Sequence, residues 1–115
     1  EARTKGNRGI IGMKMEKTYK LKDLEQVAAL AHPLRRKILI TLIDKPTNVA
    51  QLAREFGEDH AKINYHVRKL MNLGLVRLIE KREKRGIMEK YYQAIAQRFT
   101  FNDLMKHLKS DRPSV

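Results

Sequence analysis

Cysteine is absent from this 115-residue chain, so disulfides and thiolate metal sites are excluded within it. Tryptophan is absent too, and only three Phe and four Tyr are present, which predicts a core of Leu, Ile and Val. No apolar run approaches the roughly 20 residues that a membrane span requires, and no secretory signal is evident. We therefore expect a cytoplasmic protein without a membrane partner.

Acidic residues are also scarce. The chain has 25 Lys and Arg against 13 Asp and Glu, a formal net charge of +12. Residues 1–20 carry six basic against two acidic residues, residues 75–98 carry seven against three, and residues 47–74 only four against three. Such a charge favours a polyanionic partner, with nucleic acid the first candidate and an acidic membrane surface the second.

The length fits one domain, which we divide into three parts. Residues 1–18 are predicted to be a flexible basic arm or an added tag, because glycines and cations occur there without periodicity. Residues 19–98 are predicted to be the folded, DNA-binding domain. Residues 99–115 are expected to hold a short helix capped by Asn102 and a loose tail.

Apolar residues at helical spacing predict four helices in the folded part. The first covers Leu21–Ala31, and the second starts at Pro33 and runs to about Ile43. The third follows Thr47 as N-cap and ends at Gly57, and the fourth follows Asp59 as N-cap and ends near Asn72. Val49, Leu52, Ala53 and Phe56 share the apolar face of the third helix. The other helices are predicted to bury Leu34, Ile38, Leu39, Leu42, Ile63, Val67 and Leu70.

The pattern then changes to that of a β-hairpin. Residues 75–79 read as a strand, residues 80–85 are charged, Gly86 supplies a turn, and residues 87–95 read as a returning strand. Tyr91 and Tyr92 should point to opposite faces, one into the core and the other along the wing or an interface. The predicted class is mainly α with a small β-hairpin, which is a winged helix-turn-helix.

Residues 30–95 resemble the ArsR-like family of transcriptional regulators. The matching segments are ALAHPLRRKILITL, NVAQLAREFG, INYHVRKLMNLGLV and the wing end KYYQAI. Metal-sensing members often carry a cysteine pair at the start of the third helix, where this chain has Asn48 and Ala50. The resemblance therefore implies a regulator without that sensor, and we expect no metal and no cofactor.

The same resemblance implies a homodimer that binds a near-palindromic operator on double-stranded DNA and usually represses. Dimer contacts would come from the first helix and the helix after the wing, which here offer Leu21, Leu24, Ala28, Leu104, Met105 and Leu108. A switch through an unidentified effector is expected, but the sequence names no ligand.

Four residues on the outward face of the fourth helix are the candidates for reading bases: His60, Lys62, Asn64 and Tyr65. Asn bonds an adenine edge bidentately, Lys reaches guanine O6 or N7, and Tyr touches a thymine methyl. Residues suited to phosphates, which set the register on the duplex, are Thr47, Arg68, Lys69, Lys81, Arg82, Lys84 and Arg85.

The remaining histidines have a plainer interpretation. His66 is expected to pack beside its helix against the wing, with titratable sensing the minority alternative. Asp103 and His107 lie four residues apart and could hold part of a zinc site, but an exposed polar pair is far commoner.

Three readings of function stay open. The first is a sequence-specific DNA-binding regulator, the second a nonspecific binder of DNA or RNA that acts through charge, and the third a protein-interaction module. An enzyme is not expected, because the sequence shows no thiol, no Gly-rich phosphate loop and no catalytic spacing of Ser, His and Asp.

Overall fold

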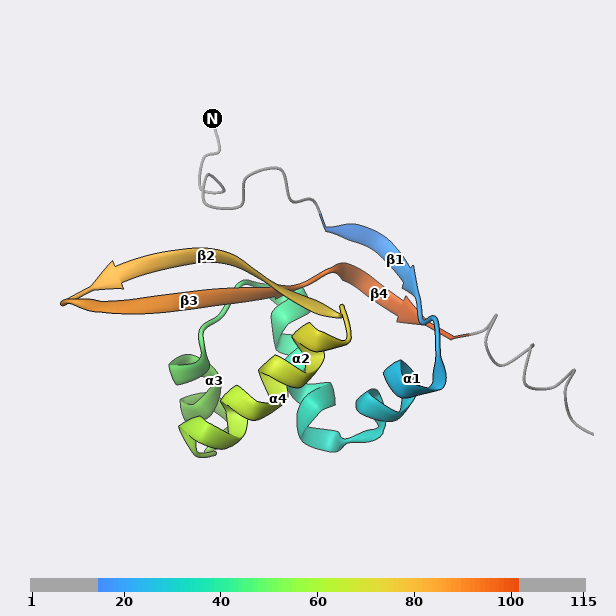
Figure 1. The fold of residues 1–115 in the computed structure, drawn as a ribbon, viewed down its shortest axis with the longest axis horizontal. Helices are drawn as coiled ribbons and strands as arrows, with labels where there is room; N and C mark the ends of the chain where they lie inside the picture. Colours follow the sequence, from blue (N-terminus) through green and yellow to red (C-terminus); the bar gives the residue numbers. More distant parts are fainter. Residues whose placement is uncertain (1–14, 102–115) are drawn as a thin grey trace, which may run out of the picture.

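A computed structural model describes residues 15–101 of the chain. Four helices pack together, and a two-stranded antiparallel hairpin extends away from them at one end (Figure 1). A second pair of strands, β1 and β4, is parallel and lies toward the other end of the molecule (Figure 1). The predicted class is confirmed: the fold is mainly α with a small β-hairpin, a winged helix-turn-helix.

The first two helices begin at residues that suit a helix start. Helix α1 spans Leu24–Ala31, and the Asp23 side chain accepts the Gln26 backbone N–H, so our predicted start at Leu21 was three residues early. Helix α2 spans Pro33–Asp44 with Pro33 in its first turn, as predicted. The ring of Pro33 has the φ that a helix needs and lacks the N–H that would stay unbonded there.

Helices α3, Val49–Phe56, and α4, His60–Asn72, form the helix-turn-helix. Gly57 ends α3 with φ +63°, the left-handed conformation predicted for it. The N-cap of α3 is Asn48 and not Thr47. Asn48 forms a capping box with Gln51, each side chain accepting the other's backbone N–H. Asp59 is the N-cap of α4, but its side chain makes no capping hydrogen bond.

The core lies where α2, α3 and α4 meet under the start of the hairpin. Its fully buried large side chains come from those helices and from Leu75. The apolar residues predicted above are buried, except Val49 and Phe56, which are partly buried and pack against the core. Removing each such side chain from water contributes roughly 1.5–3 kcal/mol, so these contacts fix the orientation of α4. The fully buried set is Ile38, Leu42, Leu52, Ile63, Val67, Leu70 and Leu75.

The hairpin consists of β2, Val76–Lys84, and β3, Ile87–Ala94. The turn at Gly86 is confirmed, but the first strand is longer than the predicted residues 75–79, because β2 continues through the charged residues to Lys84. Lys84 pairs with Ile87, so the loop contains only Arg85 and Gly86, with φ +52° and +78°. Positive φ at both positions defines a type I′ turn, whose twist matches that of the strands.

Residues 16–20 form a strand that the sequence analysis missed. Strand β1, Glu16–Lys20, pairs in parallel with β4, Ala96–Thr100, so residues 16–18 do not belong to a flexible arm. Both strands are short, and almost the whole described chain lies between them in the sequence. The predicted helix after Asn102 and the pair Asp103 and His107 lie outside the described residues. None of the helices in the described part is long and apolar enough to cross a membrane.

Candidate nucleic-acid interface

Helix α4 is divided sharply into a buried and an exposed face. Ile63, Val67 and Leu70 are completely buried, and the candidates for base contacts lie on the opposite side. Tyr65, an aromatic residue, is 59% exposed there. The exposed candidates are His60, Lys62, Asn64, Tyr65 and Arg68, as the sequence predicted. Lys69 is only partly exposed.

A groove of about 490 Å³ separates the helix-turn-helix from the hairpin. His60, Asn64 and Arg68 line it from α4, and Lys90 lines it from β3. Val49, Met71, Leu78 and Tyr92 also line it. The structure therefore brings two predicted base-contact residues and one predicted phosphate-contact residue to a single concave surface.

Lys90 is a residue of this surface that the sequence analysis missed. It lies two positions before Tyr92 and so shares its face of the strand, which packs toward the helices. Lys81 of β2 lies directly opposite Lys90 in the register. Like charges directly opposite in a sheet repel one another, so this pair is suited to an anion. The sequence contained the signal for this position, because Lys90 and Tyr92 are two residues apart and therefore share one face of a strand.

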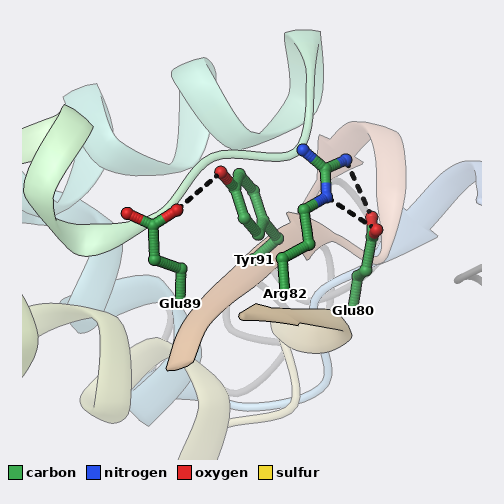
Figure 2. A network of polar contacts seen from close by, with 4 residues as sticks. All are labelled: Glu80, Arg82, Glu89 and Tyr91. Carbon is green, nitrogen blue, oxygen red and sulfur yellow. Dashed lines mark hydrogen bonds and ion pairs between the residues drawn. The ribbon is translucent and has the colours of Figure 1, made fainter. Parts of the chain in front are cut away.

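The wing also carries a network of polar contacts, drawn in Figure 2, and one of its members, Glu89, lines the groove beside Lys90. Arg82 donates hydrogen bonds to both carboxylate oxygens of Glu80, at 2.7 and 3.1 Å, and its guanidinium lies 4.4 Å from the Tyr91 ring centroid. The Tyr91 hydroxyl donates to Glu89 at 3.2 Å. The hydrogen bond to Glu80 is the main cause that raises the pKa of Arg82.

This network bears on two expectations. Tyr92 belongs to the core cluster and Tyr91 lies along the wing, as the alternation predicted. Arg82, expected to contact phosphate, already has a carboxylate partner, so it could reach DNA only by leaving Glu80 or by sharing its N–H groups. Lys84 and Arg85 are exposed at the tip.

Two other candidate residues have bonds within the protein. Thr47 is only 2% exposed, its hydroxyl donates to the Lys45 carbonyl, and its backbone bonds that of Tyr92 in both directions. Thr47 is therefore a buried bridge to the hairpin and not a phosphate contact. Lys62 makes an ion pair with Glu58 at 3.1 Å, four residues earlier, and stays half exposed. Such exposed pairs contribute little to stability.

His66 is buried, as expected, and its ring contacts a histidine at the start of the fold. Its ring lies 4.6 Å from that of His32, which occupies the junction between α1 and α2. Burial is the largest cause that lowers the pKa of His66. Across residues 15–101, no group of three His, Asp or Glu side chains could hold a metal ion.

The residues expected at a dimer interface differ in exposure. Leu21 belongs to the core, with 7% exposure, and so is not free for a partner. Leu24 is 55% exposed, and Ala28 is exposed beside it on α1. A second groove, of about 470 Å³, runs between α1 and β4 and is lined by Val27, Leu30, Phe99 and Phe101 among others. Leu104, Met105 and Leu108 lie outside the described residues.

Comparisons with known proteins agree with this geometry. A family model described as a helix-turn-helix domain matches residues 30–79. The solved structure of NolR from Sinorhizobium fredii is 25% identical, with a TM-score of 0.53, covering 76% of this chain and 77% of that one. The transcriptional regulator HlyU from Vibrio vulnificus is 21% identical, with a TM-score of 0.52, covering 76% and 83%.

A third solved structure, the transcriptional repressor BigR from Xylella fastidiosa, is 20% identical with a TM-score of 0.52, covering 80% of this chain and 88% of that one. No curated protein sequence matches the chain. The chain thus contains a helix-turn-helix domain within a winged helix-turn-helix fold. This fold is shared with solved structures of transcriptional regulators, in agreement with the resemblance that the sequence motifs indicate.

Proposed function

We propose that this protein is a sequence-specific, double-stranded DNA-binding transcriptional regulator that acts as a homodimer on a near-palindromic operator. One observation carries the proposal: the exposed face of α4 and the inward face of the wing share one groove, lined by Asn64, Arg68 and Lys90. A helix with polar groups along its exposed face fits the major groove, and a wing beside it reaches the flanking backbone. The proposed role is binding and not catalysis.

Base reading is assigned to the exposed residues of the first turns of α4. Asn64 would bond an adenine edge, and Lys62 would reach a guanine once it leaves Glu58. Each good bidentate contact discriminates by about 1–3 kcal/mol against the wrong base. Helix α4 is therefore the recognition helix of this proposal.

Backbone contacts are assigned to Arg68 of α4 and to Lys81, Lys84, Arg85 and Lys90 of the wing. Lys81 and Lys90 oppose each other across the two strands, and a phosphate between them would relieve their repulsion. Glu83 of β2 reduces the positive charge of the wing near its tip. Contacts of this kind set the register on DNA and make binding depend steeply on salt.

The homodimer is supported by an apolar surface and by the family resemblance. The groove between α1 and β4 is lined mainly by apolar side chains, and Leu24 and Phe101 are exposed, 55% and 43% respectively. In a dimer the two recognition helices would enter successive major grooves about 34–36 Å apart. Repression is the outcome that the resemblance implies, and a ligand that changed this spacing would release DNA.

The first experiment is selection from a random double-stranded DNA library at near-physiological salt, with sequencing of the bound fraction. The proposal expects an enriched inverted repeat with half-sites about one helical turn apart. Retention of DNA without any enriched motif would favour a nonspecific nucleic-acid binder, which the net charge of +12 supports. Loss of all DNA retention would contradict both and favour a protein-interaction module.

Three single variants then separate the roles. Asn64→Ala should weaken binding to the enriched motif by about 1–3 kcal/mol while leaving binding to random DNA nearly unchanged. Lys90→Ala should weaken both about equally and reduce the salt slope by about one. Lys17→Ala, which removes a cation from β1 at a distance from the wing tip, is the matched control (Figure 1).

A further inference from the structure

Three buried nitrogen atoms without a hydrogen-bond partner gather at one corner of the protein. They are Nδ1 of His32, Nε of Arg35 and Nδ1 of His66, and no other buried side-chain nitrogen or oxygen in the described part lacks a partner. Buried polar atoms are nearly always bonded, so three exceptions on neighbouring side chains need an explanation. DNA contact does not provide one, because these atoms are buried.

The corner joins the recognition helix to the start of the fold. His32 lies between α1 and α2, Arg35 lies in the first turn of α2, and His66 lies on the buried face of α4. The two imidazole rings are 4.6 Å apart and tilted by 45°, and His66 is 6% exposed. His66 also meets the ring of its neighbour Tyr65 edge-on, at 5.1 Å, and Tyr65 is exposed on the reading face.

This arrangement favours an uncharged His66. Desolvation by burial lowers its pKa most, and positive charge on His32, Arg35 and Lys62 lowers it further. Only Glu58 acts in the other direction, and it is paired with Lys62 at 3.1 Å.

We propose that His66 is a positioning residue of the recognition helix: its uncharged ring, packed on His32, holds α4 against the α1–α2 junction, and acid weakens this contact. His66 itself touches no DNA. It acts through the orientation of α4 and through Tyr65, which lies next to it in the chain. The inference rests on the proposed function, because the orientation of α4 matters only if α4 reads DNA.

The direction of the pH effect follows from the lowered pKa of His66. A histidine whose pKa is lower in the folded than in the unfolded protein contributes its stabilisation above the unfolded value of 6.5. The contribution is lost as the pH falls through the lower, folded pKa. Below that pH a charged His66 would be repelled by the positive charges of Arg35 and Lys62. Each unit by which folding lowers the pKa of His66 corresponds to about a tenfold change in the equilibrium between the folded and unfolded protein.

The test measures DNA affinity and unfolding for wild type and His66→Phe at about pH 7.5 and pH 5.0. The Phe ring preserves an aromatic contact with His32 but cannot be protonated. Wild type should lose about three- to tenfold more affinity on acidification than His66→Phe, with a parallel loss of stability in the free protein. Equal pH profiles for the two proteins would overturn the inference.

Two variants that leave His66 and His32 unchanged test the inference even if His66→Phe folds poorly. Arg35→Gln removes a nearby cation and should move the acid midpoint upward, and Glu58→Gln removes the opposing acid and should move it downward. Lys37→Gln removes an exposed cation from α2 as the control and should not move it. The inference would be overturned if the acid midpoints of Arg35→Gln and Glu58→Gln equalled that of the control. Failure to bind DNA even at about pH 7.5 would instead overturn the proposed function.

Discussion

The tip of the wing offers a prediction in which stability and DNA binding change in opposite directions. Arg85 has φ +52°, and among residues 15–101 it is the only non-glycine residue with positive φ. Asn-Gly is the preferred pair for a type I′ turn, because the short Asn side chain tolerates the left-handed region. We predict that Arg85→Asn makes the free protein more stable and its complex with DNA weaker.

The size of both effects follows from the structure. A left-handed L-residue costs roughly 1–2 kcal/mol, of which Asn avoids a part, so the gain should be about 0.5–1 kcal/mol. For a domain of this size, such a gain raises the melting temperature by about 2–8 °C. The exposed guanidinium is also lost, so the slope of log affinity against log salt should fall by about one.

Thermal and urea unfolding, followed by circular dichroism, measure the stability. Fluorescence anisotropy with a labelled duplex at several salt concentrations measures the slope. Gly86→Ala serves as the comparison, because Gly86 has φ +78° with open space around it, so its cost comes from the backbone alone. A stability that falls in Arg85→Asn would refute the turn argument. An unchanged salt slope would show that Arg85 makes no phosphate contact.

Three further predictions concern the parts that position the recognition helix. Asn48→Ala should lower the urea unfolding free energy by about 0.5–2 kcal/mol, because the capping box of α3 is lost; no loss would contradict its role. Ile63→Ala leaves a cavity at a fully buried site and should cost about 2–5 kcal/mol, with a loss below 1 kcal/mol arguing against this packing. Gln26→Leu removes hydrogen bonds to the Leu73 carbonyl and the Lys22 N–H, and should cost about 1–3 kcal/mol. Amide exchange at Lys22 should then accelerate, and unchanged exchange would speak against that bond.

Most of the helical fold could be predicted from the sequence because its signals are local. Apolar periodicity located α2 and α4, and Gly57 located the end of α3. The N-cap of α3 was misassigned although the signal was present. Asn48 has Gln at the third position after it, whereas Thr47 has Ala50 there. Only the first spacing allows the reciprocal bonds of a capping box.

Strands β1 and β4 could not be predicted, because each depends on a partner far away in the chain. Neither five-residue segment, EKTYK or AQRFT, shows strong alternation of apolar and polar residues. The contact of His66 with His32 is hidden for the same reason, since it depends on how α4 packs against the α1–α2 junction. The exposed face of α4 was predictable because a helix period alone separates it from the buried residues.

Because β1 pairs with β4, the first and last described strands join the chain into a closed loop. During synthesis β1 leaves the ribosome long before its partner, so the β1–β4 sheet can form only after residues 96–100 have appeared. Pairing across so long a loop is also a slow kind of folding step. A shortened chain that begins after Lys20 would leave β4 as an unpaired edge, which invites association with other chains.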